Sequence, residues 1–225
     1  VALREPGGSP IAVYSAYSAH YAGDTGAGHI SADYFGYYCE KLKRRLSSAE
    51  QDPPFVAMMA NSTSGDIGLN LDTFRHLQGP KGNYGRCRFL GDDLAKKVDN
   101  ALSEVSWQSH AQLDACYREL ALAWRTIEPE MIEWAKDIEA RAPRLPEGNL
   151  PIAARWATTR DLVAPFEKTF MVELNHGYLG YLPTPRHFKL GGYSTWPGTN
   201  YLEPQASEKI VDELVGMAKE LSPLQ

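Results

Sequence analysis

Two short apolar runs, each followed by small polar or glycine residues, constrain the fold of this chain more than any other feature. Residues 10–18 (PIAVYSAYS) are rich in β-branched and aromatic residues and lead into the glycine-rich stretch 23–28. Residues 54–60 (PFVAMMA) form the second run, which stops at the small polar residues 61–66. Apolar runs of this length that are bounded by turn residues predict buried strands.

Helical patterns follow both apolar runs. Ser31 is a suitable N-cap for a helix that continues to about Leu46, and the cations near its C-terminal end suit the helix dipole. After a turn-rich stretch at residues 79–91, four aliphatic residues of 92–105 share one helical face. The sequence therefore predicts a helix on each side of the second strand.

The second half of the chain predicts further elements of both kinds. Residues 113–124 begin with an alternating pattern and residues 169–174 are apolar, so each stretch indicates a strand. Helical stripes occupy residues 129–140 and the stretch after Pro204. This alternation predicts an α/β fold, a mixed sheet flanked by helices, in one domain of catalytic type over residues 1–225.

Charge and hydrophobicity exclude two classes of partner. The chain has 23 Lys and Arg against 28 Asp and Glu, a net charge of -5, which gives no electrostatic footprint for nucleic acid. No apolar stretch is long enough for a transmembrane segment, and no signal peptide is recognisable. Because the chain begins with Val1 rather than Met, we interpret it as a fragment or a processed product.

The three cysteines predict neither a disulfide framework nor a cysteine zinc site. Cys39, Cys87 and Cys116 are odd in number and widely spaced, without a CxxC motif. We expect three unpaired thiols, which are mostly core residues in proteins of this kind.

Three places in the sequence are candidates for chemistry, and each has a plain structural alternative. His20 follows the first strand in a loop of small residues, where its ring either faces a pocket or makes a structural hydrogen bond. Residues 61–66 form either a nest of backbone amides for an anion or an Asx-rich turn. In residues 177–185 the tyrosines either face a cleft or serve as packing between glycines and prolines.

Four stretches of the chain resemble the neutral/alkaline non-lysosomal ceramidase family, in its bacterial ceramidase-like branch. They are YSAHYAGD with HISADYFGYY (residues 14–38), PFVAMMANSTSGDIGLNLD (54–72), FMVELNHGYLGYLPTPRHFKLGGYSTW (170–196) and YLEPQASEKIVDEL (201–214). The resemblance implies a zinc-dependent amidase that cleaves the N-acyl bond of ceramide, a hydrolase of sphingolipid metabolism. It also implies a lipid or small-molecule amide substrate and a secreted or periplasmic location.

The resemblance assigns site residues wherever the motifs match. His20 matches a histidine ligand of the zinc ion, and Tyr181 in GYLGY matches a tyrosine ligand. Tyr193 in GGYST matches a tyrosine that hydrogen-bonds the reacting carbonyl, a catalytic role that a phenol fills as an oxyanion donor. Zinc in such a site lowers the pKa of bound water and polarises the amide.

Other parts of the family pattern have no counterpart here. The family's first histidine ligand lies in an N-terminal segment that this chain lacks, and its glutamate-ligand motif, LPGE or LPCE, does not occur. A segment is also missing near residue 164, and Glu167 lies at a different place in the alignment, so it is not assigned as a ligand. Gly68 stands where ceramidases have a serine, so a related N-acyl substrate is an alternative to ceramide.

Two functions therefore remain open for this chain. One is an incomplete zinc-dependent amide hydrolase domain, inactive or weakened as a fragment. The other is a catalytically degenerate remnant that binds a lipid or another ligand without metal. Two matched ligands favour the second reading for this chain, since zinc sites use three or four protein ligands. The retention of His20, Tyr181 and Tyr193 favours the first.

Overall fold

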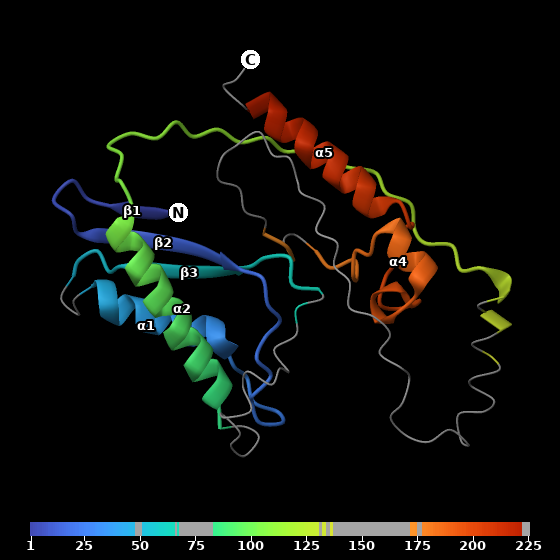
Figure 1. Ribbon diagram of the computed structural model, residues 1–225, viewed down its shortest axis with the longest axis horizontal. Helices are drawn as coiled ribbons and strands as arrows, with labels where there is room; N and C mark the ends of the chain where they lie inside the picture. The colour runs from blue at the N-terminus through green and yellow to red at the C-terminus, as the bar shows by residue number, and fades with distance from the viewer. Residues whose placement is uncertain are drawn as a thin grey trace. The chain divides into compact units, whose positions relative to one another are not determined.

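The computed structural model describes residues 1–47, 51–65, 67, 83–130, 132–133, 136, 172–174 and 177–221. The chain divides into two compact units. Unit 1 comprises Val1–Leu113 and Phe170–Asn175, and unit 2 comprises Asp114–Thr169 and His176–Gln225. Unit 1 contains the sheet and helices α1 and α2, and unit 2 contains helices α4 and α5 (Figure 1).

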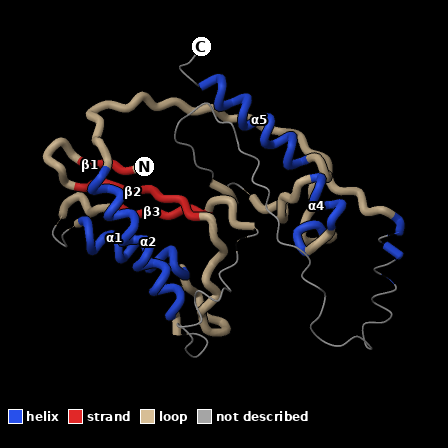
Figure 2. The backbone as a smooth tube through the Cα atoms, in the orientation of Figure 1, coloured by secondary structure: helices blue, strands red, loops and turns tan. Residues whose placement is uncertain are grey.

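Unit 1 is built on a mixed three-stranded sheet in the order β1-β2-β3 (Figure 2). Strand β1 (Ala2–Arg4) is antiparallel to β2 (Pro10–Tyr17), and β2 is parallel to β3 (Val56–Asn61). The two predicted strands are thus direct neighbours, and the predicted α/β class with a mixed sheet and packed helices is confirmed. The short β1 has no apolar run of its own and was not expected.

Helix α1 (Asp33–Leu46) connects the two parallel strands, and its start differs from the prediction. Ala32 occupies the N-cap position, without a side-chain hydrogen bond. The hydroxyl of Ser31 instead accepts a bond from the Asp33 amide at 3.0 Å. The Asp33 carboxylate accepts the Tyr34 amide at 2.7 Å, so a residue inside the first turn satisfies an amide that an N-cap side chain would otherwise bind.

Helix α2 (Gly85–Glu104) begins earlier than the expected Asp92, because its glycines are helical and not part of a turn. Gly91 lies where α2 crosses α1. A Cβ atom at this position would be 2.6 Å from the Cβ atom of Tyr37 and 2.7 Å from the backbone nitrogen of Tyr38. The glycine therefore allows the two helices to approach closely, a role that a turn signal in the sequence does not reveal.

The core of unit 1 lies between the sheet and these two helices. Tyr34, Tyr38 and Leu42 of α1 are fully buried, and Val13, Phe55, Cys87, Leu90, Leu94 and Ala95 pack with them. The Tyr38 hydroxyl shares a hydrogen bond of 2.6 Å with Ser15 Oγ. Burial raises the pKa of the Cys87 thiol to about 12. Cys39, Cys87 and Cys116 are all free, which confirms the expectation of three unpaired thiols.

Unit 2 contains α4 (Pro185–Leu190), a 3-10 turn η3 (Tyr193–Thr195) and α5 (Ala206–Leu221). The C-terminal helix was predicted, whereas α4 was expected to be loop. Thr184 and His187 form its capping box, and Pro185 occupies its first turn.

The prediction of a strand over residues 113–124 is wrong. This stretch is extended but makes only an isolated bridge between Trp124 and Leu202. Tyr117 is 79% exposed, so the alternating pattern has no sheet to pack on.

Two other expectations fall partly outside the described residues. Of the helix expected over 129–140, residues 129, 130, 132, 133 and 136 are helical. Of the strand expected over 169–174, residues 172–174 are described and do not belong to a strand. No helix among the described residues has both the length and the apolar character needed to cross a membrane.

Candidate functional site

The ends of the parallel strands bring two of the sequence candidates to the same edge of the sheet. The register pairs Tyr17, the last residue of β2, with Asn61, the last residue of β3. The Ser62 amide donates to the Tyr17 carbonyl at 3.1 Å, and the His20 amide donates to the Ile67 carbonyl at 3.0 Å. The loop that carries His20 and the polar loop after β3 are therefore bonded to one another. This edge, at the carboxyl ends of parallel strands, is where α/β proteins commonly bind ligands.

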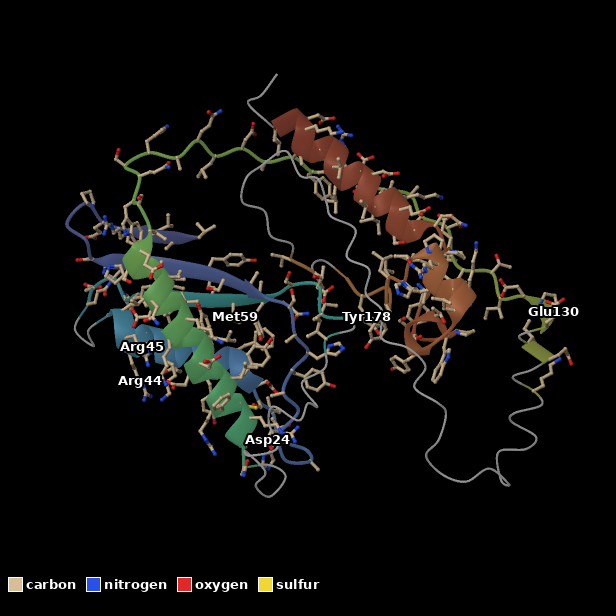
Figure 3. All side chains as sticks on the ribbon, viewed as in Figure 1. Asp24, Arg44, Arg45, Met59, Glu130 and Tyr178 are labelled. Atoms are coloured by element: carbon tan, nitrogen blue, oxygen red, sulfur yellow. The ribbon has the colours of Figure 1, made fainter. Side chains whose placement is uncertain are left out.

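The loop after His20 is held by Asp33, which sequence reasoning had not singled out. Its carboxylate accepts the amides of Ala22 at 2.7 Å and Gly23 at 3.2 Å, and only 9% of Asp33 is exposed. Asp24 lies beside the first turn of α2 (Figure 3) and accepts the Arg86 amide at 2.9 Å. The backbone that follows His20 is thus fixed to the starts of both helices.

The polar loop after β3 binds a carboxylate of the chain itself. Glu173 Oε1 accepts the Ser64 amide at 2.8 Å, the Ser64 hydroxyl at 2.6 Å and the Asn61 side-chain amide at 3.0 Å. The loop therefore supplies donors to an anion, and in this structure the anion is Glu173. Sequence reasoning missed Glu173 because no local pattern links it to partners more than a hundred residues earlier.

His20 is half-buried and its ring lies beside Tyr21, with ring centroids 6.2 Å apart. At the end of β3, Asn61 Oδ1 is buried and has no hydrogen-bond partner among the described residues. Within the described part of the chain, no group of three or more His, Cys, Asp or Glu side chains is arranged to hold a metal ion. An imidazole is a suitable zinc ligand, but the described residues do not complete a site around it.

In unit 2 the structure brings together the two tyrosines that the sequence assigned. The rings of Tyr181 and Tyr193 are 5.5 Å apart between centroids and meet edge to face at 80°. Trp196 continues the cluster, with its ring 5.3 Å from that of Tyr193. Tyr193 is 57% exposed, so a ligand can reach its phenol, whereas Tyr181 is half-buried.

The backbone around Tyr181 is anchored from both sides. Its amide donates to the Thr199 carbonyl at 2.7 Å, and its carbonyl accepts the Asn200 side-chain amide at 2.8 Å. Gly180, at a φ of +79°, lies against the Thr199 backbone, where a Cβ atom would be 3.0 Å from the carbonyl carbon. Only glycine adopts this conformation at such close range without strain.

The structure thus places His20 in unit 1 and both Tyr181 and Tyr193 in unit 2, while Glu167 lies outside the described residues. The tyrosine pair and the bonded loops beside His20 are the two parts of the candidate site whose internal geometry is defined. No family model matches the sequence, and no curated protein or solved structure matches it significantly.

Proposed function

We propose that this chain is a zinc-dependent amide hydrolase domain of the neutral ceramidase type, which cleaves the N-acyl bond of ceramide or of a related N-acyl substrate. The observation that carries the proposal is the contact between Tyr181 and Tyr193. An amidase of this type requires the metal ligand and the oxyanion donor to be neighbours, and the rings that would fill these two roles are packed together.

The roles follow from the chemistry of the side chains. His20 and Tyr181 would bind zinc through an imidazole nitrogen and a phenol oxygen. Bound zinc supplies a water of lowered pKa and polarises the substrate carbonyl. The Tyr193 hydroxyl donates a hydrogen bond to the oxygen of that carbonyl as negative charge develops on the oxygen. This hydrogen bond stabilises the transition state more than the bound substrate.

The surface around the tyrosine pair suits an apolar substrate. Tyr178, Tyr193 and Tyr201 expose 64%, 57% and 39% of their surfaces, and Trp196 exposes 37%. Tyr and Trp side chains are enriched at binding surfaces, where their rings offer apolar area. The acyl chain of the substrate would lie against these rings while the amide is held beside Tyr193.

The proposal is tested by zinc analysis and hydrolysis together, on the purified 225-residue chain. We expect stoichiometric zinc and chelator-sensitive hydrolysis of a fluorescent N-acyl sphingosine. His20→Ala should lose the zinc, whereas Tyr193→Phe should keep it and lose about 100-fold in kcat with little change in KM, as for the removal of one oxyanion donor.

Two matched controls distinguish these effects from general damage. His110→Ala removes an exposed histidine, and Tyr117→Phe removes the hydroxyl of a tyrosine that is 79% exposed. Both variants should keep zinc and activity. Wild-type protein without zinc or turnover, or an unchanged kcat in Tyr193→Phe, would contradict the proposal.

A second function, a metal-free binding remnant, is favoured by one observation. The described residues contain no group of three metal-binding His, Cys, Asp or Glu side chains. In that case N-acyl sphingosine would bind equally well with and without chelator, and it would be recovered intact after incubation.

A further inference from the structure

We propose that a groove between α1 and α2 binds an aromatic phosphate monoester, a compound of the size and chemistry of a nucleoside monophosphate. The groove lies within unit 1 and has a volume of about 500 Å³. Ligand sites in proteins commonly have volumes of about 300 to 1,000 Å³. The inference is independent of the amide hydrolase proposed above, because the residues that line the groove have no role in that reaction.

Helical spacing brings the lining side chains to one side of the helix pair. On α1, Tyr37, Lys41 and Arg44 follow one another at intervals of four and three residues, so they share a face of the helix. On α2, Arg88 and Asp92 are four residues apart and likewise share a face. The two faces form the walls of the groove.

The groove carries positive charge that the described residues leave largely uncompensated. No described carboxylate pairs with Arg88, whose guanidinium donates to the backbone carbonyl of Asn83. The Arg44 guanidinium, near the C-terminal end of α1 (Figure 3), is 3.9 Å from the carboxylate of Glu40, and both side chains are exposed. Exposed pairs of this kind contribute little free energy, so both guanidinium groups remain able to bind an anion.

Asp92, a carboxylate in the wall of the groove, is surrounded by cations. The Lys96 ammonium is 2.6 Å from the Asp92 carboxylate. The cations of Arg45 and Lys41 are 3.7 Å and 3.8 Å from it. The hydrogen bond from Lys96, together with the charges of the three cations, lowers the pKa of the Asp92 carboxyl. The charge of Asp92 is therefore compensated, and among the described lining residues Glu40 is the acidic side chain that opposes an anion.

Two guanidinium groups favour a phosphate ester over a carboxylate as the ligand. A phosphate monoester carries a charge of about −1.5 to −2 at pH 7, which matches the combined charge of Arg44 and Arg88. Its oxygens also accept paired hydrogen bonds from the planar guanidinium group. A carboxylate, with a single negative charge, would match one of the two arginines.

The remaining wall of the groove suits a planar ring. Tyr37 is half-buried and Phe89 is 41% exposed, and both rings line the groove. A volume of about 500 Å³ is much larger than a phosphate group, so a ligand that fills the groove has a body as well as a charge. Aromatic side chains stack on nucleobases of any kind, because every base has a π-face. Volume, rings and arginines together therefore point to a nucleoside monophosphate.

The test is a titration of the purified 225-residue chain with adenosine monophosphate, adenosine and inorganic phosphate, followed through the backbone amide signals in NMR spectra. Adenosine monophosphate should bind at least about tenfold more tightly than either of its parts, because it uses both the arginines and the rings. Its signal changes should fall within residues 37–44 of α1 and 88–92 of α2. Its affinity should fall as the salt concentration rises.

Substitutions at exposed positions separate the contributions without disturbing the core. Arg44→Gln and Arg88→Gln should each weaken the binding of adenosine monophosphate about three- to tenfold, whereas Glu40→Gln should strengthen it about two- to threefold. Phe89→Ala should weaken it about fivefold or more and leave the binding of inorganic phosphate unchanged. Lys43→Gln is the matched control, because it removes one positive charge from α1 outside the groove and should stay within about twofold of wild type.

Tighter binding of the nucleotide than of its parts, with a loss in both arginine variants and a gain in Glu40→Gln, would support the groove as its site. Equal affinities for adenosine monophosphate and inorganic phosphate would overturn the proposal, since the rings would then contribute nothing. A loss in Lys43→Gln as large as that in Arg44→Gln would also overturn it, because the attraction would be general and not local. Amide signals of the groove that change on dilution of the protein alone would assign the groove to a second copy of the chain and would overturn it too.

Discussion

Substitution of Gly91 by alanine is the most direct test of how α1 and α2 form the core of unit 1. The added Cβ atom would lie 2.6 Å from Tyr37 Cβ, 2.7 Å from Tyr38 N and 2.9 Å from Tyr37 C. Two of these atoms belong to the backbone of α1, so no side-chain rotation relieves the overlap. The helices have to move apart, and the contacts on both sides of the crossing weaken.

The expected magnitude is the difference between two opposing effects. Overpacking in a core costs about 1–3 kcal/mol. Alanine is favoured over glycine inside a helix by about 1 kcal/mol. Because backbone atoms cause the overlap, we expect the upper half of the overpacking range and a net destabilisation of about 1–2 kcal/mol. Gly216→Ala in α5 is the matched control, because no atom lies within 4 Å of the position of its Cβ and only the helix preference should act.

Amide hydrogen exchange measures the local stability of each variant in the unit that carries the substitution. In Gly91→Ala the Leu94 amide of α2 should exchange about tenfold faster, since about 1.4 kcal/mol corresponds to a factor of ten. In Gly216→Ala the amides of α5 should exchange more slowly, while Leu94 should be unchanged. An unchanged or slower rate at Leu94 in Gly91→Ala would refute the close approach of the two helices.

Two further predictions concern charged groups of unit 1. Asp33→Ala should lower the free energy of unfolding, measured with urea, by about 3 kcal/mol, because it leaves backbone amides unpaired at a residue that is 9% exposed. Asp33→Asn retains one acceptor oxygen and should therefore cost less. The Lys96 ammonium, 2.6 Å from the Asp92 carboxylate, lowers the pKa of that carboxyl in the folded protein. Asp92 therefore stabilises the fold at pH values above its pKa in the unfolded chain, and this stabilisation is lost as the pH falls through its lower pKa in the folded protein. Asp92→Asn should therefore cost about 0.5 kcal/mol of unfolding free energy at neutral pH. It should also reduce the loss of stability between about pH 5 and pH 3, measured by urea unfolding at each pH. The same loss in wild type and variant would contradict this.

The sequence predicted those elements whose pattern is local. Strands β2 and β3 and helices α1 and α5 each have an apolar run or a helical stripe that is sufficient without tertiary contacts. The start of α2 was misplaced because Gly91 has the same local appearance in a turn and in a close helix crossing. The strand over residues 113–124 was predicted from alternation alone, and alternation produces a strand only where a neighbouring strand supplies hydrogen bonds.

In the candidate site, too, the sequence predicted the residues that follow a local pattern and missed those whose partners come from tertiary contacts. His20 and the loop after β3 follow predicted strands, and the parallel pairing of these strands explains why they meet. Asp33 and Glu173 were missed because their partners are defined only by the fold. Glu173 lies in an apolar run that reads as a strand, and nothing near it in the sequence indicates that its carboxylate binds a loop more than a hundred residues away.

Among the described residues, no strand lies beyond β1 or beyond β3 in the mixed sheet of unit 1, but these two edges are not equally suited to the addition of another strand. Strand β1 has three residues and an irregular register between Leu3 and Arg4, which makes it a poor template for another chain. Strand β3 has six residues, and among the described residues no further strand pairs with its outer side, although the Glu173 amide donates to the carbonyl of its last residue, Asn61, at 3.1 Å. Its Val56 and Met58 are 48% and 41% exposed, so the edge is flanked by apolar side chains. Intermolecular pairing, and the aggregation that follows from it, should therefore begin at β3, and a lysine at position 58 would be the simplest way to suppress it.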